Sequence, residues 1–280
     1  MIADEHELVC TSALVITAFI PVSYIGLLYY CDWNGKNRDS CESIRGRAIG
    51  VCLSCVICVN VTAFFLYWQD IDVLRAMGLR ASGIFAAVTL PLLLTMLLFL
   101  GPFALMVADG TATELCSVEH WSEVASDPIC VRNLLIAPVT EELAFRACAV
   151  PLLLRCFDAN TVLQGAPALF ALCHYHHVAD RLRKGSSILH AMLACSFQAA
   201  YTYAFGMYAA YLFVRTGHLL SCILCHVFCN YMGFPEVQQI FTHRRWTVRL
   251  ALIGCFVLGA LAWYLALVPL TQPTLYYYND

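Results

Sequence analysis

Long apolar runs are the feature that most constrains this chain. Runs of about 20 or more mostly apolar residues recur along it, and a helix needs about 20 such residues to cross a bilayer. Only 12% of the 280 residues are charged and 61% are hydrophobic, whereas a soluble domain carries about 25% charged residues. A membrane β-barrel would instead show short alternating segments. The pattern therefore predicts an all-α, multi-pass membrane protein.

Eight apolar segments are long enough to be transmembrane helices. They are Leu8–Tyr30, Ala48–Trp68, Ala81–Ala108, Asn133–Leu154, Ala159–Ala179, Ser186–Val214, Thr216–Pro235 and Leu250–Leu270. The third contains two prolines, Pro91 and Pro102, at which we expect breaks. The first, second, third and eighth contain no Asp, Glu, Lys or Arg, which is typical of scaffold or lipid-facing helices. No linker or repeat divides the sequence, so we expect one transmembrane domain over residues 1–280.

The distribution of basic residues predicts an orientation in the membrane. The loops after spans one, three, five and seven hold Lys36, Arg38, Arg45, Arg47, Arg132, Arg181, Arg183, Lys184, Arg244, Arg245 and Arg249. The other loops hold only Arg75, Arg80, Arg155 and Arg215. Because loops rich in Lys and Arg stay in the cytosol, this bias places both termini in the lumen. The net charge of −3 and the lack of a basic tail give no indication of a nucleic-acid partner.

Three ionisable residues interrupt the fourth span. Glu141, Glu142 and Arg146 lie in an otherwise apolar run, where each costs about 2.5–3.5 kcal/mol at the centre of a membrane helix. Glu142 and Arg146 are four residues apart with the acid first, the favourable order for an ion pair on one helix face. Glu141 is rotated away from that face and stays free to act as a general base. A purely structural ion-pair cluster is the alternative.

The fifth span ends in a group of aromatic and histidine side chains. Phe170 and His174 are four residues apart, and His174 and His177 share a helix face, whereas His176 points elsewhere. His174 lies deepest and is the better candidate for a catalytic role. We expect His176 and His177 to lie at the membrane interface, with His177 supporting the site.

The seventh span carries His226 and Asn230, again four residues apart and on one face. An imidazole and a carboxamide there present two hydrogen-bond donors, which can stabilise an oxyanion. The alternative is that both simply hydrogen-bond to neighbouring helices.

The predicted orientation places all three groups at one depth. Spans four, five and seven each carry their polar residues in the cytosolic half of the bilayer. Glu141, His174 and the pair His226 and Asn230 at one level form a hydrolytic arrangement. Glu141 would deprotonate water that His174 helps to hold, and His226 and Asn230 would receive the negative charge of the attacked carbonyl.

These motifs resemble those of the type II CAAX prenyl endopeptidases, the glutamate-dependent, Ras-converting intramembrane proteases. The resemblance rests on EExxxR (Glu141, Glu142, Arg146), FxxxH (Phe170, His174) and HxxxN (His226, Asn230), and on the segments TEELAFRAC, RTGHLL and CHVFCNYMGFP. It covers most of the chain, although spans one and two resemble the family only in hydropathy.

The resemblance implies an eight-helix cavity in the endoplasmic reticulum membrane, open to the cytosol and to lipid. The substrates would be farnesylated or geranylgeranylated CAAX proteins such as Ras-type small GTPases, which lose their last three residues. Glu141 and His174 would activate water, and His226 with Asn230 would form the oxyanion hole. No metal or other cofactor is implied.

Three other functions fit the same residues. A zinc-dependent protease could use Glu141, His174 and His226 as ligands, although the HExxH motif is absent. A transporter could use intramembrane Glu and His as an ion path, but such proteins commonly contain two repeated halves with broken helices, which we do not find. A non-catalytic membrane scaffold that retains the motifs is the third.

Overall fold

The computed structural model describes residues 2–33 and 37–277, so Lys36 of the first basic loop lies outside the described residues. The α-helices are α1 Ile2–Cys31, α2 Cys41–Trp68, α3 Val73–Ala76, α4 Ile84–Leu98, α5 Leu100–Asp109, α6 Val118–Ser126, α7 Pro128–Val131, α8 Ala137–Glu142, α9 Ala149–Leu153, α10 Ala159–Cys173, α11 His177–Arg183, α12 Ile188–Thr216, α13 Leu219–Met232 and α14 Trp246–Leu270. Two π-helical segments, η2 Arg132–Ile136 and η3 Leu143–Cys148, flank α8, and a 3-10 turn, η4 His174–His176, joins α10 to α11. Further 3-10 turns are η1 Thr111–Cys116, η5 Val237–Thr242 and η6 Pro273–Leu275. The described ranges contain no strand, and the all-α prediction is confirmed.

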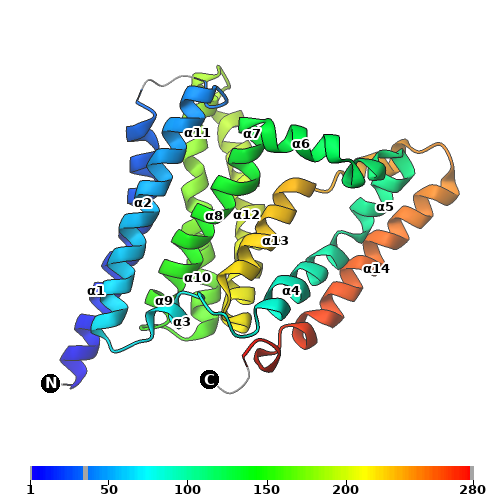
Figure 1. The fold of residues 1–280 in the computed structure, drawn as a ribbon. Coiled ribbons are helices and arrows are strands. Elements are labelled where there is room, and N and C mark those ends of the chain that lie inside the picture. The colour runs from blue at the N-terminus through cyan, green and yellow to red at the C-terminus, as the bar shows by residue number, and fades with distance from the viewer. Residues whose placement is uncertain (1, 34–36, 278–280) are drawn as a thin grey trace.

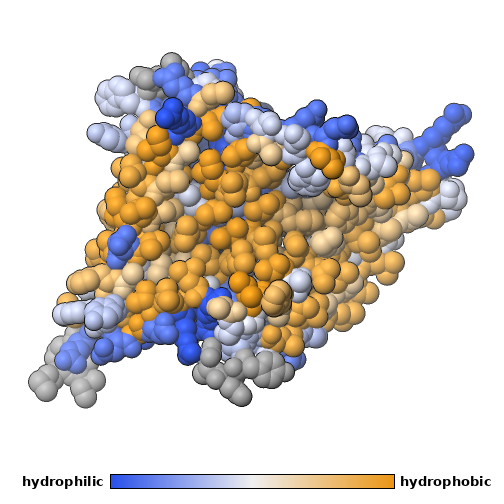
Figure 2. All heavy atoms as spheres, in the orientation of Figure 1, coloured by the Kyte–Doolittle hydropathy of each residue, from blue (hydrophilic) through white to orange (hydrophobic). Residues whose placement is uncertain are grey.

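The helices run back and forth between two ends of the molecule. Figure 1 shows the α1–α2 turn, helices α6 and α7, the α11–α12 turn and the α13–α14 link at the upper end, and both chain ends at the lower. Figure 2 shows a hydrophobic band across the visible face, with hydrophilic groups gathered toward the two ends. This arrangement is that of a multi-pass membrane protein, and the described residues of the basic loops share its upper end.

Three helical segments are long and apolar enough to cross a membrane by themselves: Glu5–Cys31, Cys41–Trp68 and Trp246–Leu270. The bent pair α4 and α5 makes a fourth if it is one span. The remaining predicted spans are shorter, more polar or divided, so the number eight stays a prediction.

The two prolines of the third span have different effects. The helix axis bends by 65° between α4 and α5, just before Pro102, whose missing N–H cannot bond to the carbonyl one turn earlier. Pro91 lies inside α4 without ending it, so the expected break there was wrong. The carbonyl of Ala87, which Pro91 leaves without its helical donor, accepts a hydrogen bond from Ser221 Oγ of α13 at 2.8 Å.

The fourth span is helical throughout but irregular. Pro138 at the start of α8 removes one backbone donor, and in η2 just before it the N–H of Ala137 bonds to the carbonyl of Arg132, five residues back. In η3 the N–H of Ala149 bonds to the carbonyl of Ala144 in the same way. Such π-helical turns are frequent at functional sites, and here they enclose the two glutamates.

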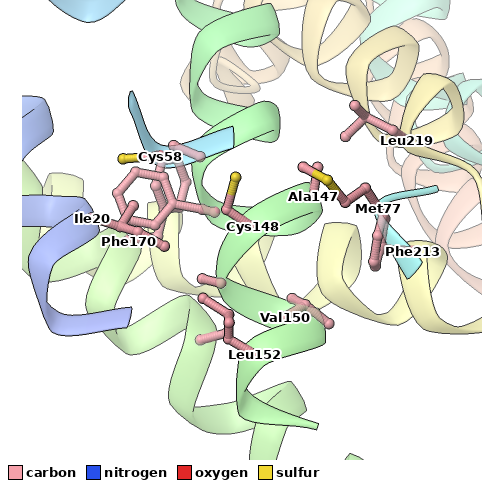
Figure 3. Close-up of a cluster of buried hydrophobic side chains, with 14 of the residues drawn as sticks. Ile20, Cys58, Met77, Ala147, Cys148, Val150, Leu152, Phe170, Phe213 and Leu219 are labelled. Carbon is pink, nitrogen blue, oxygen red and sulfur yellow. The ribbon is translucent and has the colours of Figure 1, made fainter. Parts of the chain in front are cut away.

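The main hydrophobic core surrounds η3 and α9. Figure 3 shows Cys148, Val150 and Leu152 of this segment in the same cluster as Ile20 of α1, Phe170 of α10 and Phe213 of α12. Small residues at the centre, among them Ala144, Ala147 and Ala149, are at most 1% exposed. Small side chains let membrane helices approach closely. The fourth span is therefore held from several sides by the helices around it.

Candidate active site

Glu142 is the most deeply buried charge of the site. It is 0% exposed, and its Oε1 lies 3.1 Å from Arg146 Nη1, so the predicted ion pair is present. The same oxygen accepts a hydrogen bond from His226 Nδ1 at 2.7 Å. The spacing of the motifs did not predict this second contact, because it joins α8 to α13.

Arg146 is held in an aromatic pocket. It is 2% exposed, and its guanidinium lies 4.5 Å from the ring centre of Phe170 and 5.9 Å from that of Phe205. Cation–π contacts of this kind are stronger where water is excluded. Gly206 allows α10 and α12 to meet beside it, since a Cβ there would lie 3.0 Å from Pro167. Phe170 therefore contacts both Arg146 and His174.

His226 lies between the two glutamates. Its Nδ1 bonds to Glu142, and its Nε2 lies 3.8 Å from Glu141 Oε2. A carboxylate only accepts hydrogen bonds, so Glu142 fixes Nδ1 as a protonated donor and sets the direction of the ring. His226 is 6% exposed, whereas the Glu141 side chain is 19% exposed. Glu141 is thus the more accessible of the two acids.

His174 has one ring nitrogen bound to its own helix. Its Nδ1 lies 3.0 Å from the carbonyl oxygen of Phe170, and since a carbonyl can only accept, Nδ1 must donate. Nε2 is then the nitrogen that can accept a hydrogen bond in the neutral ring. The ring of Phe170 meets that of His174 edge-on at 5.0 Å, which fixes the orientation of the imidazole.

Asn230 and His226 are on α13 as predicted, but they contact different partners. The Nδ2 atom of Asn230 donates to the backbone carbonyl of Asn133 in η2 at 2.9 Å. Asn230 is exposed, whereas His226 is buried. His177 lies near the mouth of the site, with its ring 6.0 Å from His174 and its Nδ1 3.7 Å from Asp180 Oδ2.

A cavity of about 770 Å³, counted with its open mouth, extends from Glu141 and His174 to Arg38 and Arg132, and neither His226 nor Asn230 is among its lining residues. Glu141, Phe170 and His174 line it, and so do residues of helices α1 and α2. The arrangement places a carboxylate and an accepting imidazole nitrogen on one cavity, with a second imidazole directly behind the carboxylate.

Comparison with known proteins identifies the family. CAAX prenyl protease 2 from Homo sapiens is 38% identical over 96% of this chain and 84% of its own length. The chain belongs to the type II CAAX prenyl endopeptidase family. The proteins named CAAX prenyl protease 2 from Arabidopsis thaliana and Caenorhabditis elegans are 34% and 32% identical, over 99% and 88% of this chain and 95% and 92% of their own lengths. The family model "Type II CAAX prenyl endopeptidase Rce1-like" matches residues 125–232. No solved structure matches.

The residues matched to this endopeptidase family include all three motifs, from Glu141 to Asn230. The chain is therefore an endopeptidase of this family, and the resemblance inferred from the motifs is confirmed. The individual roles of the motif residues remain proposals.

Sequence reasoning missed several residues that line the cavity. Tyr24 of α1 lines the cavity, and its hydroxyl lies 2.8 Å from Thr140 Oγ1, next to Glu141. Arg47 and Val51 of α2 also line it. The first two spans were expected only as scaffold or lipid-facing helices, because they contain no Asp, Glu, Lys or Arg. A tyrosine inside an apolar run was the one available signal.

The zinc-ligand hypothesis needs three donors close together. In the part of the chain that the structure describes, no three His, Cys, Asp or Glu side chains lie close enough to hold a metal ion, and Glu141, His174 and His226 do not form such a group. The geometry of the described residues thus gives the zinc alternative no support, and chelation tests it directly.

Proposed function

We propose that this protein removes the C-terminal aaX tripeptide from prenylated CAAX proteins by the attack of a water molecule that Glu141 activates. The substrate class comes from the relatives, which are named CAAX prenyl protease 2. The observation that carries the mechanism is the position of Glu141, on one cavity with His174 and 3.8 Å from His226.

The reaction begins with the transfer of a proton from water to Glu141. The Nε2 atom of His174 accepts the second hydrogen of that water and so orients it. The oxygen attacks the carbonyl carbon of the prenylated cysteine, and the carbonyl oxygen becomes an oxyanion. Collapse of the intermediate breaks the C–N bond, and Glu141 returns its proton to the departing amine of the tripeptide.

His226 stabilises the oxyanion as an imidazolium. Its Nδ1–H donates to Glu142, so Nε2 can donate only when the ring carries both protons. Asn230 supplies a second donor from one turn along the same helix. Glu142 and Arg146 thus hold His226 in place and do not contact the substrate.

We further propose that the enzyme lies in the endoplasmic reticulum membrane with its cavity open to the cytosol. The basic loops support this orientation because they gather at the end where the cavity opens. Prenylated proteins arise in the cytosol, and Ras-type small GTPases are the expected substrates.

A cleavage assay on purified protein tests the proposal. A farnesylated CAAX peptide is expected to lose its tripeptide, and the unprenylated peptide is expected to be cleaved far more slowly. Activity should persist after strong chelation. Loss of activity with chelator and recovery with Zn²⁺ would establish the zinc mechanism instead.

Single substitutions then test the residues. Glu141→Ala, His174→Ala and His226→Ala are each expected to abolish cleavage at normal expression. His190→Ala, which changes an exposed histidine at the start of α12, is the matched control and should retain full activity. Normal turnover by Glu141→Ala would disprove the mechanism, and an inactive wild-type protein would favour a scaffold.

A further inference from the structure

Two arginines at the mouth of the cavity have no part in the mechanism above. Arg38 lies in the turn between α1 and α2, and Arg132 begins η2. Both line the same cavity as Glu141 and His174. Their side chains are only 31% and 14% exposed, so two cations are partly withdrawn from water at the entrance.

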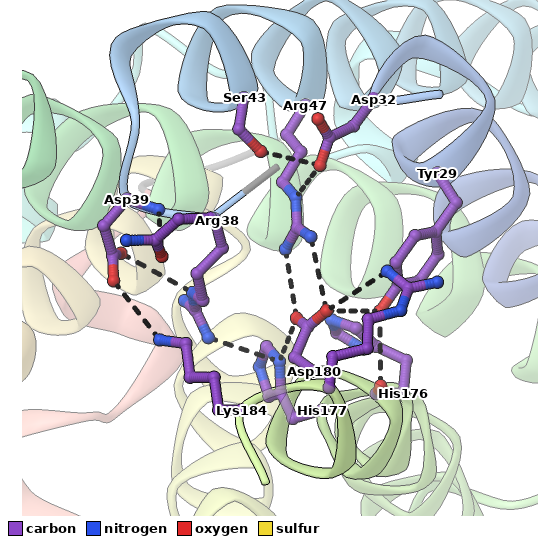
Figure 4. A network of polar contacts seen from close by, with 12 residues as sticks. Tyr29, Asp32, Arg38, Asp39, Ser43, Arg47, His176, His177, Asp180 and Lys184 are labelled. Atoms are coloured by element: carbon purple, nitrogen blue, oxygen red, sulfur yellow. Dashed lines mark hydrogen bonds and ion pairs between the residues drawn. The ribbon is translucent and has the colours of Figure 1, made fainter. Parts of the chain in front are cut away.

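The third arginine of the cavity, Arg47, is neutralised by two carboxylates. Arg38 and Arg132 are only partly neutralised. Arg47 Nε lies 2.7 Å from Asp32 Oδ2, and its Nη1 lies 3.2 Å from Asp180 Oδ2, as Figure 4 shows. Arg38 and Arg132 share the single carboxylate of Asp39, at 3.7 and 3.0 Å.

The same carboxylate also receives a third cation. Lys184 Nζ lies 3.6 Å from Asp39 Oδ2, and Figure 4 shows Arg38, Asp39 and Lys184 gathered at one side of the network. Within the described ranges, three cations therefore meet on Asp39. The mouth of the cavity has an excess of positive charge.

The pKa values of Arg38 and Asp39 reflect this excess of positive charge. Burial, and then the charge of Arg132, lower the pKa of Arg38. Burial alone would raise the pKa of the Asp39 carboxyl, but Arg132, Arg38 and Lys184 together hold it below its ordinary value. An anion that entered here would relieve the repulsion between the two guanidinium groups.

The distance from Arg132 to Glu141 is close to the length of a short extended peptide. Arg132 and Glu141 are nine residues apart on one helical segment, which is about 13 Å at 1.5 Å per residue. Three extended residues reach about 10–11 Å. A tripeptide whose first amide bond lies at Glu141 would therefore end about 3 Å short of the level of Arg132, a gap that the long arginine side chain can span.

We propose that Arg38 and Arg132 bind the terminal carboxylate of the substrate. This inference rests on the proposed function, because it assigns the free C-terminus of the CAAX sequence to the mouth of the cavity. Guanidinium groups suit this ligand, since they pair with a carboxylate through two parallel hydrogen bonds. By holding the C-terminus of the substrate, the two arginines would place the peptide bond three residues before it at Glu141, and cleavage would occur there.

The test compares a farnesylated CAAX peptide that ends in a free carboxylate with the same peptide ending in an amide. The wild-type enzyme should prefer the acid by about 10- to 100-fold in kcat/KM, the loss expected for charge-assisted hydrogen bonds. In the double variant Arg38→Gln with Arg132→Gln the ratio should fall close to one. The single variant Arg38→Gln should lower the ratio of acid to amide cleavage only partly.

Two further variants sharpen the test. Arg183→Gln removes a nearby cation that is 58% exposed and lies 4.0 Å from Asp180, and it should keep the wild-type ratio. Asp39→Asn removes the competing carboxylate and should lower KM for the acid peptide. Inhibition of the wild-type enzyme by the free tripeptide should likewise be stronger than inhibition by its amide.

Two results would overturn the proposal: equal cleavage of acid and amide by the wild-type enzyme, or a loss in the double variant that is the same for both peptides. These differ from a failure of the proposed function, in which the wild-type enzyme cleaves neither peptide and this inference falls with it.

Discussion

The segment around Glu142 and the group formed by α4, α5 and α14 are packed in very different ways. Every residue from Ala144 to Leu153 is buried, and the main core cluster surrounds this stretch. In α14, by contrast, only Leu252 and Gly259 are buried. A small cluster of Leu105, Ile240 and Leu252 joins α5 to the first half of α14, whereas Leu94 of α4 belongs to the main cluster. Figure 1 shows α5 and the start of α14 leaning away from α13.

The difference shows where a membrane protein can hold charge. Glu142 and Arg146 are at most 2% exposed and lie where helices surround them on several sides. Helix α4 contains no charged residue at all. Burying an ion pair is tolerable only with close partners, and the densely packed segment supplies them. In α5 and α14 the charged residues, Asp109 and Arg249, stand near one end of the helix, so the apolar remainder of these helices can face lipid.

The largest effect is expected for Glu141→Gln. The change keeps the shape of the side chain but removes the general base, which contributes typically about 10²–10⁴-fold to rate. Glu141 makes no ion pair as close as that of Glu142, so thermal stability should stay near that of the wild type. Cleavage of a farnesylated peptide and thermal unfolding in detergent are the two measurements. A large fall in stability would mean that Glu141 is structural.

Glu142→Gln should lower both stability and activity. It leaves the Arg146 charge buried without its partner, and breaking a buried pair costs about 3–5 kcal/mol. It also weakens the bond that orients His226. Thermal unfolding and kcat/KM measure the two losses. The double variant Glu142→Gln with Arg146→Met should recover much of the stability without recovering activity, and an unchanged unfolding temperature in Glu142→Gln would contradict the packing argument.

The motifs predicted most of the site because they are local. The spacing of Glu142 and Arg146 gives their contact directly, since residues four apart meet on a helix. The depth of the three clusters was inferred from loop charges and stays a prediction, whereas the contact of His226 with both glutamates shows that spans four and seven meet at these residues.

The rest depends on how helices pack, which periodicity does not encode. Phe205 covers Arg146 from α12, and Tyr24 reaches Thr140 from α1, but neither belongs to a motif. The continuity of α4 through Pro91 depends on Ser221 of another helix. Asn230 shares a helix face with His226, yet its side chain donates a hydrogen bond to the backbone carbonyl of Asn133, which the motif does not predict.

Leu152→Ala tests the packed segment with no change of charge. Leu152 is 0% exposed, and truncation of a buried leucine costs about 2–5 kcal/mol, depending on how far the surroundings close the cavity. The unfolding temperature should fall clearly. The acid-to-amide preference should be retained, because the mouth of the cavity is not altered. A negligible shift would show that this segment is less tightly packed than the structure indicates.

The smallest effect is expected for Leu258→Ala on α14. This side chain is 59% exposed, and a surface change away from packed features usually alters stability by no more than about 0.5 kcal/mol. Leu252→Ala in the same helix is the matched control, because Leu252 is 3% exposed and its loss should destabilise measurably more. Thermal unfolding and kcat/KM of both variants give the comparison. If Leu258→Ala instead impaired cleavage of the prenylated peptide at normal stability, the outer face of α14 would contact the substrate, and the division between a packed catalytic segment and a purely lipid-facing one would fail.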